Sequence, residues 1–181
     1  MKPWSVITTS FLLLMMHQLG YSQNNIPASG SNFTTKQASD FLSHHNMARK
    51  EFKIPPLQWD TEIAAYAQEW AEYLALKKRC KMIHREEVNK NPKDYGENIY
   101  WVSGSANFNP VNASEMWYEE KSIFENNNRQ FDWRQDMGHY TQMIWGNTTH
   151  VGAGYATCPS GAVIVVASYN PPGNYKDSNP F

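Results

Sequence analysis

Apolar side chains recur at helical intervals in the first part of the chain. Thr34 and Gln37 have the spacing of a capping box, which predicts a helix from this point to about Phe52. The inner face of this helix would carry Ala38, Phe41, Leu42, His45, Ala48 and Phe52. The Ile54-Pro55-Pro56 segment ends it, because proline lacks the backbone N–H that a helix interior needs.

Two further helices are predicted from the same periodicity. Asp60 can cap the first of them, which is expected to end near Lys78 to Cys80. Its apolar stripe would consist of Ile63, Ala67, Trp70, Leu74 and Leu76. The other helix is expected after Pro110 and is predicted to end near Asn126 to Asn128. Its apolar anchors would be Met116, Trp117 and Phe124.

The remaining apolar runs have the composition and alternation of strands. Glu97 to Val102 is rich in β-branched and aromatic residues, which predicts a strand. Residues 151–155 and 163–169 alternate around Pro159-Ser160-Gly161, which predicts a hairpin. Because helices come first and the hairpin last, the pattern predicts an α+β fold.

Composition narrows the classes of protein that fit this pattern. The 181 residues are typical of one domain, and 41% hydrophobic and 14% aromatic residues allow a sizeable core. Lys+Arg 16 against Asp+Glu 17 gives a formal net charge of -1. This balance argues against a nucleic-acid binder that works by neutralising phosphates.

Residues 1–22 have the pattern of a secretory signal peptide. Lys2 precedes an apolar run from Phe11 to Met16, and small residues follow before Gln23. The run is too short for a membrane span, and no later segment reaches about 20 apolar residues. We therefore expect a secreted, extracellular protein. Residues 23–33 are predicted to be a flexible lead-in, and residues 34–181 to be the domain.

Cys80 and Cys158 are the only cysteines in the chain. Export to an oxidising compartment favours a disulfide between them over two free thiols or a metal-thiolate site. Asn32, Asn112 and Asn147 each begin an N-glycosylation triplet and would then lie in exposed loops.

Four polar side chains stand in otherwise apolar surroundings. His84 follows Met82-Ile83, and Glu97 opens a predicted strand. Glu120 lies on the third predicted helix, and His139 precedes an apolar run. Two imidazoles and two carboxylates suit zinc binding or acid–base chemistry. The alternative is structural: half-buried, hydrogen-bonded histidines and carboxylates that accept backbone amides.

Segments in four parts of the chain resemble the motifs of the CAP superfamily, which comprises cysteine-rich secretory, antigen 5 and pathogenesis-related class 1 proteins. The two signatures are GHYTQMIWGNT at 138–148 and ASYNPPGNY at 167–175. HNMAR at 45–49 with PLQW at 56–59, and GENIYW at 96–101, occur in the family's order. On these motifs the chain is identified as a member similar to the pathogenesis-related class 1 proteins.

The resemblance implies a three-layer α-β-α sandwich with a central, mainly antiparallel sheet. It also implies a cleft with two histidines and two glutamates, which match His84, Glu97, Glu120 and His139. The family's Trp-x-x-Glu spacing selects Glu120 over Glu119. The two histidines would hold zinc or another divalent metal with low affinity, and the two glutamates would tune that affinity.

Plant relatives of this class typically carry six cysteines. Four of those positions hold other residues here: Phe131, Met137, Ala153 and Ala167. The resemblance thus leaves Cys80 and Cys158 as each other's partner.

Three functions follow from the resemblance. The first is non-enzymatic binding of a sterol, another small lipid or an extracellular protein partner, in defence or host interaction. Phe124, Phe131 and Trp133 would line the groove, unless these rings serve only packing.

The second function is hydrolysis of peptides or esters, with Ser103 as nucleophile beside His84 and Glu97. Such a relay needs a hydrogen bond of about 2.6 to 3.2 Å between hydroxyl and imidazole. The alternative is that Ser103 is a turn residue. The third function is a precursor role, in which residues 171–181 are released as a signalling peptide.

Overall fold

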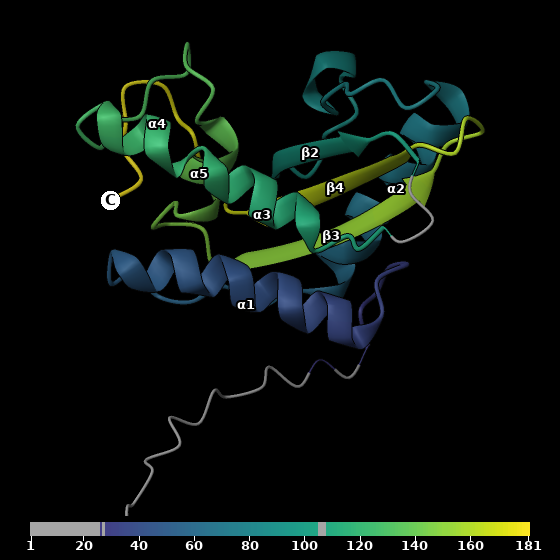
Figure 1. Ribbon diagram of the computed structural model, residues 1–181, viewed down its shortest axis with the longest axis horizontal. Coiled ribbons are helices and arrows are strands. Elements are labelled where there is room, and N and C mark those ends of the chain that lie inside the picture. The colour runs from purple at the N-terminus through teal and green to yellow at the C-terminus, as the bar shows by residue number, and fades with distance from the viewer. Residues whose placement is uncertain (1–25, 27, 105–107) are drawn as a thin grey trace, which may run out of the picture.

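The computed structural model describes residues 26, 28–104 and 108–181. Its four-stranded sheet packs against α2 on one face and shares a core with α1, α3 and α5 on the other. In Figure 1, α2 lies behind the sheet, α3 crosses in front of it, and α1 runs below β3. The strands are β1 (Gln58–Trp59), β2 (Gly96–Val102), β3 (His150–Thr157) and β4 (Val163–Asn170), in the order β1-β3-β4-β2. Among the strands of the described residues, β1 and β3 pair in parallel and the other two pairings are antiparallel. The predicted α+β sandwich with a mainly antiparallel sheet is confirmed.

Two long helices begin where their capping residues predict. Helix α1 (Thr35–Glu51) has a complete capping box between Thr34 and Gln37. Helix α2 (Thr61–Lys77) begins after Asp60, whose carboxylate accepts from two backbone N–H groups of the first turn. The shorter helices are α3 (Asn112–Glu119), α4 (Lys121–Asn126), α5 (Gly138–Met143) and the 3-10 turn η1 (Glu86–Val88).

Some expectations for the helices were wrong. The single helix expected after Pro110 is two helices, α3 and α4, which meet at Glu120. Met116 is 45% exposed and Leu76 is 69% exposed, so neither anchors the core. Each lies on the outer side of its helix, because neighbouring apolar residues already fill the inner side. The sequence pattern also missed α5 and the two-residue strand β1.

Strand β4 is buried on both faces and so joins two cores. Its alternate residues Val163, Val165, Ala167 and Tyr169 belong to the core that includes α1, α3 and α5. Ile164 and Val166 belong to the other core, which packs against α2. Gly152 and Gly154 of β3 lie where α2 crosses the sheet, and a Cβ atom on either would lie within 2.6 Å of α2 atoms. Glycine at these positions lets the helix approach the sheet.

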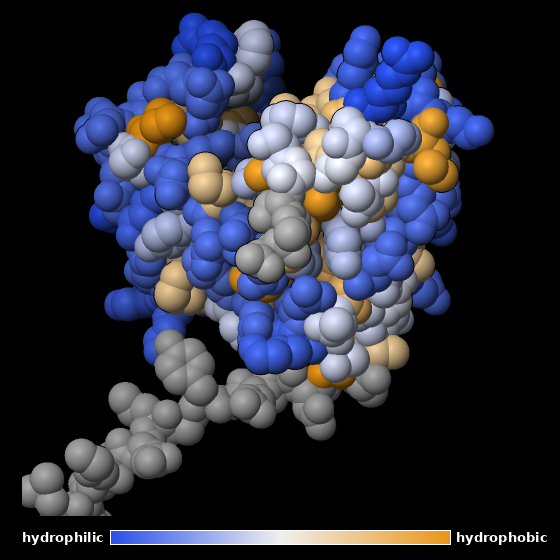
Figure 2. All heavy atoms as spheres, turned by 45° about the vertical axis from the view of Figure 1, so that its right-hand side comes forward, coloured by the Kyte–Doolittle hydropathy of each residue, from blue (hydrophilic) through white to orange (hydrophobic). Residues whose placement is uncertain are grey.

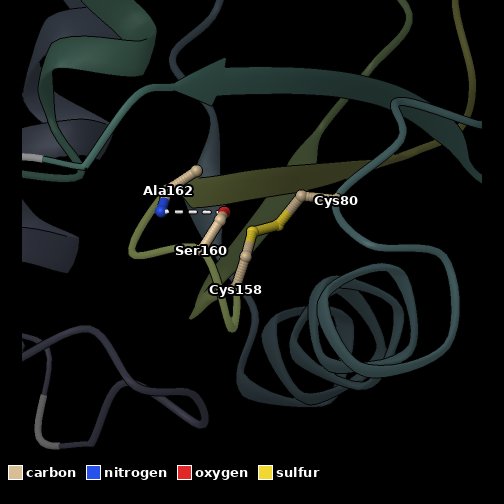
Figure 3. Close-up of a disulfide and its surroundings, with 4 residues drawn as sticks. All are labelled: Cys80, Cys158, Ser160 and Ala162. Carbon is tan, nitrogen blue, oxygen red and sulfur yellow. Dashed lines mark hydrogen bonds between the residues drawn. A yellow bond between two sulfur atoms is a disulfide. The ribbon is translucent and has the colours of Figure 1, made fainter.

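The Cys80–Cys158 disulfide, which the resemblance and the expected compartment both predicted, closes the end of this second core (Figure 3). It joins the segment after α2 to the β3–β4 turn, with 6.0 Å between the two Cα atoms. The turn is itself held by the Cys158 N–H, which donates to the Ala162 carbonyl at 2.7 Å. Ala153 and Ala167, which replace two family cysteines, are register partners across β3 and β4.

Both ends of the described chain pack against the domain. Phe33 is 3% exposed, and the Trp59 indole N–H donates to the Ser29 carbonyl, so this part of the predicted lead-in is folded. At the C-terminus, Pro180 is buried and the Phe181 ring stacks on Phe52 at 4.9 Å. The signal peptide predicted at 1–22 lies outside the described residues.

None of the helices in the described part of the chain is long and apolar enough to cross a membrane.

Arg49 of α1 is buried and donates to four backbone carbonyls. Its Nε bonds to the Pro55 oxygen at 2.7 Å, and its Nη2 bonds to the Thr148 oxygen at 2.9 Å. Its Nη1 bonds to the oxygens of Met143 and Trp145 at 3.1 and 2.8 Å. Burial lowers the pKa of Arg49 to about 10, so the guanidinium is still charged at neutral pH. Arg49 thereby connects α1 to the end of α5 and to the turn before β3.

We expect Arg49→Met to lower the free energy of unfolding by at least about 3 kcal/mol, because it leaves buried carbonyls without donors. Lys50→Met, at the exposed neighbouring position, should change it by less than about 0.5 kcal/mol. Urea unfolding at pH 7 measures both. A loss of under about 1 kcal/mol in Arg49→Met would contradict this account of the contacts.

Candidate functional site: two histidine–glutamate pairs beside a cleft

The first pair joins His84, in the segment after α2, to Glu97 at the start of β2. The His84 Nδ1 atom donates to Glu97 Oε1 at 2.9 Å, and the same oxygen accepts the Arg85 backbone N–H at 3.1 Å. The His84 side chain is 48% exposed and the Glu97 side chain 10%. The hydrogen bond to Glu97 raises the pKa of the His84 imidazole above its usual value.

The second pair joins His139 of α5 to Glu120, between α3 and α4. The His139 Nδ1 atom donates to Glu120 Oε1 at 2.5 Å. Glu120 Oε2 accepts the backbone N–H groups of His139 and Tyr140 at 2.9 and 3.1 Å. Glu120 therefore satisfies two free N–H groups in the first turn of α5 while it holds the imidazole. The Trp117 ring stacks on His139 with an interplanar angle of 9°.

A chain of buried hydrogen bonds from Asn98 to His45 holds the backbone of His139. The Asn98 side-chain amide donates to the His139 carbonyl at 3.0 Å and to the Tyr169 hydroxyl at 3.1 Å. The Tyr169 hydroxyl lies 2.9 Å from His45 Nε2, and His45 Nδ1 donates to the Phe41 carbonyl. Burial lowers the pKa of His45 to about 3, so the ring is neutral and Nε2 can accept from Tyr169. The sequence singled out neither Asn98 nor Tyr169 for such a role.

A cavity of about 420 Å³ adjoins the first pair. It lies between two lobes, one with α4, α5 and the C-terminal tail and the other with segment 80–95; Figure 2 shows the notch that separates them. The lining includes His84, Glu97 and Gln142, together with segment 172–176. His139 and Glu120 do not line it, so the cavity directly involves one of the two pairs.

The two signature segments that carry the family resemblance contact each other beside this cavity. The Asn174 side-chain amide donates to the Gly138 carbonyl at 2.7 Å, and its oxygen accepts the Thr141 hydroxyl at 2.8 Å. The Gly173 N–H donates to the Gln142 side-chain oxygen at 2.9 Å. The tail therefore forms a fixed wall of the cleft.

The structure separates Ser103 from the residues predicted to act with it. Strand β2 pairs with β4 residue by residue from Gly96 to Val102, without interruption. At about 3.3 Å per residue, Ser103 lies roughly 20 Å from Glu97, at the other end of the strand. Because Glu97 holds His84, the proposed Ser103–His84 hydrogen bond is not formed.

Two of the three aromatic residues predicted to line one groove, Phe131 and Trp133, line a cavity of about 370 Å³ between the loop after α4 and the C-terminal tail. The third residue lies elsewhere. Phe124 is 0% exposed and packs in the core against Tyr140 and Phe181, so it cannot contact a ligand in a surface groove. Phe131 is partly buried against Trp145, and Trp133 is 64% exposed. This correction leaves no groove that all three residues line.

The three predicted glycosylation sites lie at exposed asparagines, but the expectation that all three are in loops was wrong for Asn112, which is in a helix. Asn32 precedes α1, Asn112 begins α3 and Asn147 lies in the turn before β3. Their modification stays a prediction.

The described residues contain no group of three or more histidine, cysteine or acidic side chains that could hold a metal ion. The donor chemistry is nevertheless that of metal-bound histidines, because a carboxylate on Nδ1 fixes the tautomer and leaves Nε2 available to a ligand. Each pair thus offers one imidazole nitrogen of this kind, from His84 or from His139.

Comparison with known proteins agrees with the motifs and the fold. The model of the CAP family, described as the cysteine-rich secretory protein family, matches residues 42–169. Pathogenesis-related protein 1A of Nicotiana tabacum is 37% identical over 143 residues, which are 78% of this chain and 79% of that protein. Pathogenesis-related protein 1C of the same plant is 33% identical over 181 residues, covering 100% and 95%. A crystal structure of NaASP2 with Zn2+ is similar in fold, with a TM-score of 0.60, 21% identity and coverage of 88% of each chain.

We expect the two histidine environments to affect stability with opposite sign. The low pKa of His45 stabilises the fold above about pH 6.5, and this contribution is lost as the pH falls toward 3. The raised pKa of His84 stabilises the fold below about pH 6.5, and this contribution is lost as the pH rises through that pKa. Between pH 6.5 and 5, His45 should change the free energy of unfolding by up to about 1.4 kcal/mol per pH unit.

Urea unfolding at several pH values measures this slope in the wild type and in His45→Gln. The slope should be smaller in the variant; equal slopes would show that His45 is not the group responsible. If the variant does not fold, proton NMR of the wild type decides, because the His45 ring should not titrate above pH 4.

Proposed function

Because the chain belongs to the cysteine-rich secretory protein (CAP) family, we propose that it is a secreted, defence-related binding protein. Its ligand would be held by His84–Glu97, which lines the cleft, and by His139–Glu120, whose helix α5 contributes Gln142 to the same lining. The observation that carries this proposal is the hydrogen bond from each imidazole Nδ1 to a carboxylate. Two rings held in this way are preorganised and present only Nε2 to a ligand. A defence role is supported by the similarity to pathogenesis-related proteins.

Secretion is supported by two features of the chain. Residues 1–22 have the pattern of a signal peptide, and the Cys80–Cys158 disulfide is typical of proteins that fold in an oxidising compartment.

Binding is a better-supported function than hydrolysis. The Ser103 relay would need the hydroxyl beside His84, whereas β2 places it about 20 Å from Glu97. The peptide-precursor alternative would require cleavage near Pro171, next to a segment whose Gly173 and Asn174 are hydrogen bonded to α5. Sterol binding in a groove lined by three aromatic residues is less well supported, because one of them, Phe124, is in the core.

A divalent metal is one ligand that the two imidazoles suit. His84 and His139 would hold it through Nε2, water would complete its coordination, and Glu97 and Glu120 would tune the affinity through Nδ1. A bound metal would supply a positive charge for anionic groups of a further ligand. Because the pKa of His84 is raised, its proton competes with the metal at a higher pH than for an ordinary histidine.

We expect the purified domain to bind one zinc ion weakly, and the affinity should rise with pH as His84 loses its proton. Isothermal titration calorimetry should show that His84→Ala and His139→Ala each lose this binding, because each removes one of two protein ligands. Glu97→Gln and Glu120→Gln should weaken it by about 10-fold or more. His150→Ala is the matched control, since His150 contacts neither pair and bonds to Thr149.

Equal zinc uptake by the wild type and the His84→Ala/His139→Ala double variant would refute the metal part of the proposal. The binding part would then be tested by mass spectrometry of small molecules retained by protein purified from its native secretion.

We expect the secreted protein to begin near Gln23 and to keep its C-terminal residues, because the tail packs against the domain through Pro180 and Phe181. Intact-mass measurement after removal of glycans checks both ends. A mass that corresponds to loss of residues 171–181 would favour the precursor function instead, and a mass that retains residues 1–22 would argue against cleavage of a leader.

A further inference from the structure

A second cavity lies between α2 and the segment that follows it. It shares Arg85 with the lining of the first cavity, but none of the four paired histidines and glutamates lines it. Its volume is about 370 Å³. One wall consists of three aromatic side chains of α2, and the other carries two cations of segment 85–92. The lining residues are Tyr66, Glu69, Trp70, Tyr73, Arg85, Asn89, Lys90 and Pro92.

Arg85 is buried in this wall with little compensation of its charge. It is 3% exposed, and its guanidinium carbon lies 3.6 Å from the centre of the Tyr66 ring and 5.1 Å from that of Trp70. Its Nη2 atom donates to the Tyr66 carbonyl at 2.9 Å. Its ion-pair partner among the described residues is Glu69, at 3.4 Å, whose side chain is 78% exposed. Such an exposed partner balances a buried charge poorly.

Several of the Arg85 donors have no partner. Its Nε atom is buried and makes no hydrogen bond within the described part of the chain. Its Nη1 atom, which is not fully buried, also donates to none of the groups described there. A buried guanidinium with unused donors is a site that favours an oxyanion, which can accept two of these hydrogen bonds at once.

Lys90, the second cation, and its neighbour Asn91 are also held against α2. Lys90 Nζ lies 4.7 Å from the centre of the Tyr73 ring, and the Lys90 N–H donates to the Arg85 carbonyl at 2.9 Å. The Tyr66 hydroxyl donates to the Asn91 side-chain oxygen at 2.9 Å. These contacts hold the segment on the helix, so both cations are in place before a ligand arrives.

We propose that this cavity binds a small molecule that carries an oxyanion (carboxylate, sulfate or phosphate) on an aromatic ring. The oxyanion contacts Arg85 and Lys90, and the ring packs among the side chains of Tyr66, Trp70 and Tyr73. Two cations against one exposed carboxylate, Glu69, make an anion the favoured ligand. The site goes beyond the proposed function, because it needs neither a metal nor the second histidine–glutamate pair.

Phenyl phosphate is a suitable probe, measured by calorimetry on the whole secreted protein in EDTA at low salt. We expect it to bind at least 10-fold more tightly than phenol, which has the ring without the charge. Arg85→Met should weaken binding of phenyl phosphate at least 10-fold, and Lys90→Gln about threefold. Lys93→Gln is the matched control, since Lys93 is exposed and does not line the cavity.

Because Arg85 is buried, circular dichroism first checks that Arg85→Met is folded. If Arg85→Met does not fold, Lys90→Gln carries the test, because Lys90 is exposed and its substitution should not unfold the protein. In NMR spectra, phenyl phosphate should shift the indole N–H resonance of Trp70, which donates to the Ile83 carbonyl. Equal affinities for phenol and phenyl phosphate, or equal affinities of the wild type and Lys90→Gln, would overturn the proposal.

The outcome is independent of the metal hypothesis. His139→Ala should bind phenyl phosphate as the wild type does, even though it is expected to lose zinc. A loss of phenyl phosphate binding in His139→Ala would place the oxyanion at the cleft instead and would overturn the second site.

Discussion

The buried Arg49 guanidinium holds together the half of the molecule that carries the second histidine. Its hydrogen bonds to four carbonyls join α1, the turn at Pro55, the end of α5 and the turn before β3. Helix α5 has six residues, too few to be stable by itself. Side chains from distant segments hold both of its ends, Glu120 at the first turn and Arg49 at the last. The position of His139 therefore depends on contacts outside its own helix.

Each histidine of the site is positioned by contacts with distant segments, and the contacts differ between the two pairs. His84 is on a loop that the Cys80–Cys158 disulfide and the hydrogen bond to Glu97 hold in place. Its side chain lines a cavity. His139 is fixed by a stacked Trp117 ring and by the chain from Asn98 to His45. His84 thus faces the cavity while His139 lies outside its lining, although both side chains stay partly exposed, at 48% and 37%.

Much of the fold was predictable because its long elements have local signals. The capping residues Thr34 and Asp60 mark the starts of α1 and α2, and the alternation from 151 to 169 marks the hairpin. Helix α5 was missed because six residues are too few to show a helical period. The apolar pattern predicts Met116 and Leu76 to be in the core, yet both are exposed, because residue type alone does not say which side of a helix is covered.

The candidate site was predictable in part. His84, Glu97, Glu120 and His139 stood out as polar residues in apolar runs, but the hydrogen bonds that make each glutamate the partner of one histidine depend on the packing of separate segments. Asn98 gave no comparable signal, since an asparagine inside a strand looks the same whether or not its amide is buried. Ser103 shows the converse: six positions from Glu97 is close in sequence, yet a regular strand makes it distant in space.

The amino-acid sequence by itself determined the class of fold, the family motifs and the residues capable of chemistry, because periodicity, capping and residue type are local properties. Only the tertiary structure decided which carboxylate holds which imidazole, that Phe124 belongs to the core, and that Arg85 is buried with unused donors. These outcomes depend on burial and on contacts between residues far apart in the chain, and neither is written in any short stretch of it.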